Sequence, residues 1–195
     1  MMAVSVVRVS LNPKRVFGAC ILLMPLCLLL GCAPKVPVHD RASAADEAKI
    51  LEGVPFVKQK ARFCGPAALA SVMRFYDDNV SQEEIAEEIY TPKLRGALIS
   101  DMAYYAQQRG YSVETPNGEV NLLVSLLNEG VPPIVLVDRG RWIVSIPHYY
   151  VIYGYNKKRN TFLLHTGFAS NEEIKFSELD REWQKMNRLL LVIRK

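Results

Sequence analysis

The stretch from residue 54 to residue 76, VPFVKQKARFCGPAALASVMRFY, constrains the fold of this chain more than any other. Apolar residues recur after Cys64 at positions 69, 72, 73 and 76, which is the spacing of one buried helix face. Pro66 suits a first helical turn, because the N–H that it lacks would be unpaired there anyway. The pattern predicts a helix that packs by its far end and presents Cys64 at its N-terminus.

A cysteine at a helix N-terminus is placed for nucleophilic chemistry. The N–H groups of the first turn are unpaired and carry partial positive charge, and such a setting lowers a thiol pKa. Gln59, upstream of Cys64, is near enough in sequence to supply the amide donor of an oxyanion hole. The competing interpretation is that Cys64 is a small buried hydrophobe, the more common role of a lone cysteine.

The N-terminal residues have the pattern of a targeting segment. A basic start is followed by mostly apolar residues over 16–30, a run that is short for a membrane-spanning helix and typical of a secretory signal. The run ends in LLGC at residues 29–32, which resembles the lipobox of bacterial lipoproteins. The resemblance implies cleavage before Cys32 and a lipid anchor on its thiol. Because Ala33 rather than Asp follows, it favours the outer membrane, facing the periplasm. The alternative is an ordinary buried apolar helix.

The sequence therefore predicts a lipoprotein signal peptide over 1–31, a tether over 32–52 and one domain over 53–195. The chain carries 24 Lys and Arg against 20 Asp and Glu, and three of the basic residues precede Cys32, which leaves a net charge of +1. That balance gives no sign of a nucleic-acid partner. Cys20 and Cys27 would leave with the signal peptide, so Cys64 would be the free thiol of an exported protein and no internal disulfide is expected.

Helical signals fill the first half of the domain and strand signals the second. Helices are expected at 43–53, where Ser43 and Asp46 suit a capping pair, from Ser81 with its capping-box partner Glu84, at 100–109 and at 119–129. Strands are expected at 134–137, 148–155, 161–165 and 189–193, with polar turns at 138–141 and 156–160 and a short helix capped by Ser177 and Asp180. Helices followed by an antiparallel sheet predict an α+β fold.

Two histidines of the domain are candidate bases for the thiol. His148 begins one predicted strand and His165 ends the next, so both fall at the same end of one hairpin. Histidine titrates near neutrality, whereas Lys or Glu would need large pKa shifts to serve. Taken alone, each histidine is more often structural, but beside a lone exported thiol they favour a Cys–His pair.

Two segments, QKARFCGPAAL and IPHYYVIYGYN, resemble the bacteriocin-processing, double-glycine-leader cysteine peptidases and their stand-alone relatives. The resemblance covers most of the predicted domain and implies a papain-like fold without a cofactor. It implies Gln59 as oxyanion donor, Cys64 as nucleophile and His148 as general base. The reaction it implies is cleavage of peptide or protein substrates, possibly after Gly-Gly. In that family the domain usually precedes an exporter, so envelope export partners are a further expectation.

One departure from that family leaves alternatives open. The family usually has an Asp on the strand after the histidine strand, and this chain has Leu-His-Thr-Gly at 164–167. His165 is then the candidate orienter of His148. A catalytically weak or inactive peptide-binding lipoprotein is the second hypothesis, and a γ-glutamyl transferase similar to phytochelatin synthases is the third. A zinc site from Cys64, His148 and His165 lacks paired-ligand spacing, so no metal is expected.

Overall fold

The computed structural model describes residues 47–195, and the predicted signal peptide, Cys32 and most of the predicted tether lie outside them. The elements follow in the order β1 (Ala48–Ile50), α2 (Cys64–Phe75), α3 (Gln82–Ile89), α4 (Ile99–Gln108), β2 (Ser112–Glu114), α5 (Val120–Asn128), β3 (Ile134–Asp138), β4 (Pro147–Asn156), β5 (Thr161–His165), β6 (Glu172–Lys175), α6 (Phe176–Trp183), the 3-10 turn η1 (Gln184–Met186) and β7 (Leu190–Arg194). None of the helices among these residues is long and apolar enough to cross a membrane.

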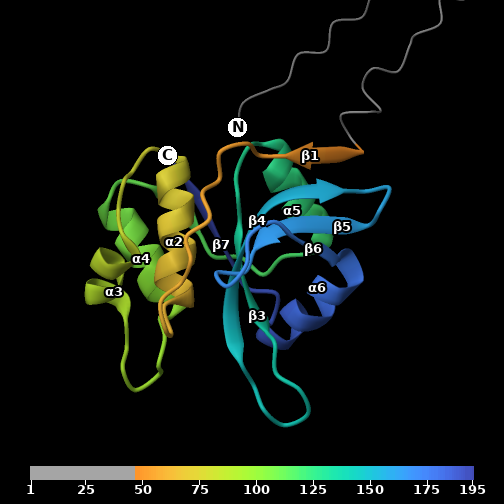
Figure 1. The fold of residues 1–195 in the computed structure, drawn as a ribbon. Coiled ribbons are helices and arrows are strands. Elements are labelled where there is room, and N and C mark those ends of the chain that lie inside the picture. Colours follow the sequence, from red (N-terminus) through yellow and green to blue (C-terminus); the bar gives the residue numbers. More distant parts are fainter. Residues whose placement is uncertain (1–46) are drawn as a thin grey trace, which may run out of the picture. The chain divides into compact units, whose positions relative to one another are not determined.

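The strands form one antiparallel sheet in the order β2-β7-β3-β4-β5-β6. The long strand β4 is central, with β3 beside its first half, β1 beside its second half and β5 on the other side. Figure 1 shows α2, α3 and α4 on one side of the sheet and α5 and α6 on the other. Because both faces are covered, every residue of β3 is buried, which is why that strand reads as an unbroken apolar run.

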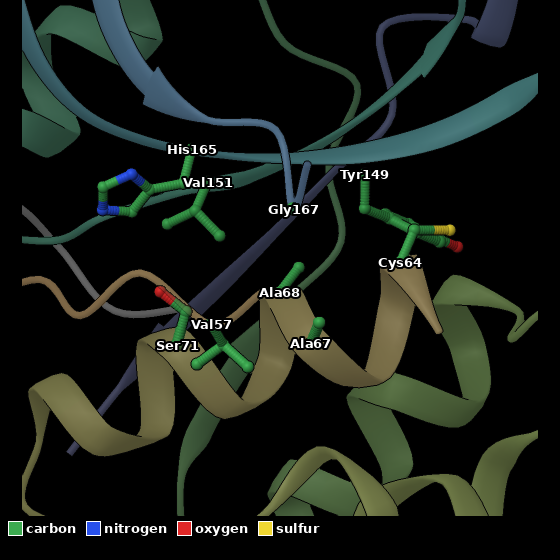
Figure 2. A pocket seen from close by; sticks show the side chains of 9 residues that line it. All are labelled: Val57, Cys64, Ala67, Ala68, Ser71, Tyr149, Val151, His165 and Gly167. Carbon is green, nitrogen blue, oxygen red and sulfur yellow. The ribbon is translucent and has the colours of Figure 1, made fainter. Parts of the chain in front are cut away.

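The helix α2 carries the packing that positions the site. Its residues from Gly65 to Met73 are all buried, and the small side chains of Ala67 and Ala68 face β4 across a narrow gap (Figure 2). Small side chains let a helix approach a sheet closely, so the start of α2 is held against the start of β4. The predicted helix is confirmed, and so is the α+β class.

Most other predicted elements are confirmed, with ends shifted by one or two residues. Ser81 and Glu84 make the reciprocal bonds of a capping box at the start of α3. Ser177 is not a cap, because α6 begins at Phe176, and Asp180 pairs with Arg188 instead.

Three short strands were not expected. The strand β1 lies where a helix was predicted over 43–53; residues 47–53 are not helical, and residues 43–46 are outside the described part. Leu51 is buried and donates its N–H to the Tyr153 carbonyl. The folded unit therefore begins before residue 53, and the predicted tether does not extend to residue 52. β1, β2 and β6 have three or four residues each, too few to show an alternating pattern. They form by pairing with the free edges of β4, β7 and β5.

Candidate active site

Cys64 is the first residue of α2, as predicted, and its side chain is half buried against β4. No side chain caps this helix end, so the first-turn N–H groups remain available. The backbone N–H groups of Tyr149, Gly65 and Cys64 itself approach the thiol. A Cβ on Gly65 would lie 3.1 Å from Ala97 and 3.3 Å from the Tyr149 ring, so glycine lets the helix start come this close to the strand.

The protonation of the thiol differs from the expectation. Burial raises the pKa of Cys64, and the three backbone N–H groups lower it by less. The helix N-terminus was expected to produce a lowered pKa, but the thiol is taken out of water by the packing of α2 on β4, and desolvation penalises the thiolate. The resting side chain is therefore a neutral thiol.

His148 is the second residue of β4 and is 5% exposed. Its Nε2 lies 2.6 Å from the backbone oxygen of Thr166. A carbonyl only accepts hydrogen bonds, so Nε2 carries the proton and Nδ1 of the neutral ring is the free basic nitrogen. Phe168 stacks on the ring with centroids 5.2 Å apart and planes at 9°, which holds its orientation.

Three effects act on the pKa of His148. Burial lowers it most, the Thr166 carbonyl raises it, and the positive charge of Arg139 lowers it. Burial disfavours the imidazolium, and the carbonyl favours it because it accepts a stronger bond from a charged ring. The net pKa lies below the ordinary value of 6.5, so the ring is neutral at pH 7.

His165 is not the orienter of His148. Its Nε2 lies 3.1 Å from the Val54 carbonyl, and its ring stacks on Tyr153 with centroids 4.5 Å apart. Figure 2 shows its ring at one end of the gap between α2 and β4 and Cys64 at the other, with Val151 between them. Val151 pairs with His165 across the sheet. His148 lies three residues before Val151, near the start of β4, where it contacts the Thr166 carbonyl. The orienting group is thus a backbone oxygen.

Gln59 lies in the loop that precedes α2, beside the chain that leaves β5. Its N–H donates to the Gly167 carbonyl at 2.9 Å, and its side-chain oxygen is buried without a hydrogen-bond partner in the described part of the chain. A Cβ on Gly167 would stand 2.6 Å from that oxygen, and Gly167 has φ +78°, so glycine is needed there on two counts. The amide oxygen lies against Gly167, and the amide nitrogen is the donor atom of this side chain.

Gln82 was not predicted as part of the site. Its Oε1 accepts from the Lys60 N–H at 2.8 Å and its Nε2 donates to the Lys58 carbonyl at 2.9 Å, so it fixes the backbone on both sides of Gln59. The side chain is buried at the first position of α3. No motif reveals this role, because it depends on α3 folding back onto the loop.

A groove of about 310 Å³ opens at Cys64 on the side away from His165. One wall is the loop of residues 94–98, and the other is formed by Leu136, Pro147 and Tyr149, with Met186 beside them. The walls are mostly apolar, and Cys64 is one of the lining residues. In the described part of the chain, no three His, Cys, Asp or Glu side chains gather to hold a metal ion.

Comparisons with known proteins identify the family and the fold. The model of the Peptidase_C39 like family matches residues 51–190. A search of curated proteins found no significant match. Among solved structures, the peptidase domain of Streptococcus ComA, a bifunctional ABC transporter involved in quorum sensing, is 24% identical with a TM-score of 0.59, over 74% of this chain and 96% of that one.

Two further structures resemble the chain. A putative C39-like peptidase from Bacillus anthracis is 17% identical with a TM-score of 0.63, over 76% of this chain and 98% of that one. A double-glycine-motif protease from an AMS/PCAT transporter, solved in complex with its leader peptide, is 19% identical with a TM-score of 0.58, over 75% and 96% of the two chains. The TM-scores support a shared fold, and the family match covers most of the chain. The chain belongs to the Peptidase C39-like family and has the papain-like fold of its peptidase domains.

Proposed function

We propose that this chain is a cysteine peptidase that hydrolyses peptide bonds with Cys64 and His148. Two observations carry the proposal: a thiol lies at the α2 N-terminus, and the buried imidazole of His148 has its Nε2 bonded to the Thr166 carbonyl. The residue after His148 approaches the thiol through its backbone N–H, which brings nucleophile and base to one end of β4. The family match supports the reaction class.

The proposed reaction begins with both groups neutral. As the Cys64 sulfur attacks the scissile carbonyl carbon, the thiol proton passes to His148 Nδ1, and the carbonyl oxygen takes the negative charge. The Cys64 N–H and the Gln59 amide nitrogen donate to that oxygen. The imidazolium then gives its proton to the leaving amine, the C–N bond breaks, and a thioester remains. Water, deprotonated by His148, hydrolyses the thioester and restores the thiol.

The Thr166 carbonyl takes the place of the missing Asp in this scheme. It fixes the tautomer and orientation of the ring as a carboxylate would, at 2.6 Å. It carries no full charge, so it stabilises the imidazolium less. A thiol tolerates this loss better than a serine hydroxyl, because it ionises far more easily. We therefore expect a working but slow enzyme.

The substrate is proposed to be a peptide with small residues before the scissile bond, possibly Gly-Gly. One similar solved structure is a double-glycine-motif protease in complex with its leader peptide, and the groove beside Cys64 has the size for an extended peptide. The residues before Cys32 support secretion and lipid anchoring, so we place the enzyme on the envelope, with the outer membrane favoured and export proteins as candidate partners.

The test is cleavage of a fluorogenic peptide library with Gly-Gly, Ala-Ala or Leu-Leu before the reporter group. We expect turnover of the Gly-Gly probe by wild-type protein and none by Cys64→Ser. Cleavage that persists in Cys64→Ser would show a contaminating peptidase. Absence of cleavage of every probe, with the peptides still bound, would favour the second candidate.

That second candidate is a peptide-binding lipoprotein without turnover. The raised pKa of the Cys64 thiol and the lowered pKa of His148 favour it, because both shifts oppose the thiolate–imidazolium pair. The groove would then hold a peptide without breaking it.

A further inference from the structure

The connection between β3 and β4, residues 139–146, projects an apolar tip from the domain; we call it the Trp142 loop. Trp142 is 102% exposed and Ile143 99%, and Val144 and Ile146 are more than half exposed. Four of the nine exposed large hydrophobic residues of the described chain lie in this segment, so the exposure is concentrated. Contiguous exposed apolar residues mark an interaction site.

The base of the loop is fixed, so the tip cannot fold back to cover itself without breaking bonds. Asp138 Oδ1 accepts the N–H of Gly140 at 2.7 Å and that of Ile146 at 2.8 Å. The Arg139 N–H donates to the Ile146 carbonyl, and Lys185 Nζ donates to the Gly140 carbonyl at 3.0 Å. The fold thus holds the apolar tip out in water.

Cations accompany the apolar tip. Arg139 and Arg141 are both exposed, and neither is in an ion pair within the described part of the chain. The Arg139 guanidinium lies over the ring of Phe168, which is itself 59% exposed. Arginines around Trp and Ile suit the region where lipid headgroups meet acyl chains, since Trp prefers that boundary and Arg binds phosphate.

The shape of the tip selects the partner. A peptide binds in a groove, whereas the Trp142 loop is a protrusion. Figure 1 shows it as the segment that joins the end of β3 to the start of β4 and extends away from the sheet. A deformable apolar layer receives a protrusion without a matching pocket. We propose that the Trp142 loop inserts into the interface of an anionic lipid bilayer.

This contact lies far from the end of the domain that the N-terminal chain enters. β1 pairs with Gly154–Asn156, and the loop precedes Pro147, so they are separated by the length of β4, about 30 Å. Residues 33–47 reach about 50 Å when extended, so a lipid at Cys32 and the loop can contact one membrane together. Pro147 lines the groove at Cys64, so insertion holds the site near the bilayer surface.

The test uses the fluorescence of the full chain, which has two tryptophans. Trp183 is fully buried and serves as an internal reference. The Trp142→Phe variant leaves Trp183 as the one tryptophan, so it gives the emission of Trp183 alone. With vesicles of phosphatidylglycerol and phosphatidylcholine, we expect Trp142 emission to shift to the blue and brominated acyl chains to quench it. Ile143→Ser with Val144→Ser should weaken quenching at limiting lipid by about tenfold or more. Arg139→Gln and Arg141→Gln should each weaken it about fivefold on anionic vesicles alone.

The readout does not depend on the peptidase, so Cys64→Ser protein should behave as wild type. Vesicles that sediment with the protein while Trp142 stays unquenched would overturn the proposal, because another segment would then hold the membrane. A blue shift that follows protein concentration without lipid would replace it with self-association. A shift produced by a Gly-Gly peptide and not by vesicles would replace it with peptide docking.

Discussion

His148 and His165 have similar surroundings and different positions. Each is 5% exposed, each has Nε2 beside a backbone carbonyl, and burial lowers the pKa of each. His148, however, precedes the residue whose N–H approaches the thiol, whereas His165 lies between Phe56 and Tyr153 at the far end of the gap. A candidate base therefore differs from a structural histidine in its position relative to the thiol. Burial and a lowered pKa do not distinguish the two.

Replacing each histidine by alanine should give the largest contrast. His148→Ala removes the base, so kcat/KM for a cleaved peptide should fall about 10²–10⁴-fold. His165→Ala should leave kcat/KM per folded molecule within a few-fold and lower the free energy of unfolding by about 1–3 kcal/mol, because the Val54 carbonyl loses its donor. Steady-state kinetics with urea unfolding measure both. Equal losses of kcat/KM in the two variants would contradict the distinction.

Gln59 should matter to turnover nearly as much as His148. Gln59→Ala removes the proposed oxyanion donor, so kcat should fall about 10²–10³-fold with little change in KM. Gly167→Ala is the companion variant, because its Cβ would displace the Gln59 side-chain oxygen from a distance of 2.6 Å. The same kinetic assay applies to both. A Gln59→Ala enzyme with wild-type kcat would remove Gln59 from the oxyanion hole.

Gln82 should act through Gln59 and have a smaller effect. Gln82→Ala releases the backbone at Lys58 and Lys60, and a displacement of about 1 Å costs up to about 10²-fold in kcat. Gln82→Glu keeps the acceptor for the Lys60 N–H but sets a carboxylate oxygen against the Lys58 carbonyl, so it should lower kcat as well. If Gln82→Ala lowers kcat equally in wild-type and Gln59→Ala backgrounds, the two residues act independently.

Lowering the pH should destabilise the folded protein through both histidines. This is the smallest of the predicted effects. Burial makes the folded pKa of each lower than the unfolded value near 6.5, so the unfolded chain takes up protons first as the pH falls. Stability should be full above pH 6.5 and be lost as the pH falls through the folded pKa values. Urea midpoints from pH 8 to pH 4 measure this. His165→Gln should flatten the profile in part, and a profile unchanged by that variant would mean that His165 is not buried in neutral form.

The fold and the place of Cys64 at the start of a helix could be read from local patterns, and the contact that orients His148 could not. Helical spacing after Cys64 predicted α2, because burial on one face leaves a periodic signal. The strand-forming residues over 148–155 predicted β4, which is buried on both faces and shows no period. The bond from His148 to the Thr166 carbonyl involves a backbone oxygen, which every residue has, so no residue type announces it. The direction of the Cys64 pKa was mistaken for a related reason. The helix end is visible in the sequence, but the desolvation comes from packing on β4.

The Trp142 loop shows the same limit. Residues 138–141 were predicted to be a polar turn, yet the connection runs on through Ile146. Asp138 ends β3 by binding the N–H groups of Gly140 and Ile146, which closes the loop at its base.

The measurement that bears most directly on the central claim is the rate at which a Gly-Gly peptide vinyl ester labels Cys64 from pH 4 to pH 10. The account has His148 Nδ1 accept the thiol proton, so wild-type labelling should rise through a pKa below 6.5 and stay fast across neutral pH. His148→Ala should lose this neutral plateau and label only as the unassisted thiol ionises at alkaline pH, while His165→Ala should follow wild type. A single alkaline limb shared by wild type and His148→Ala would contradict the account and leave the groove as a peptide-binding site.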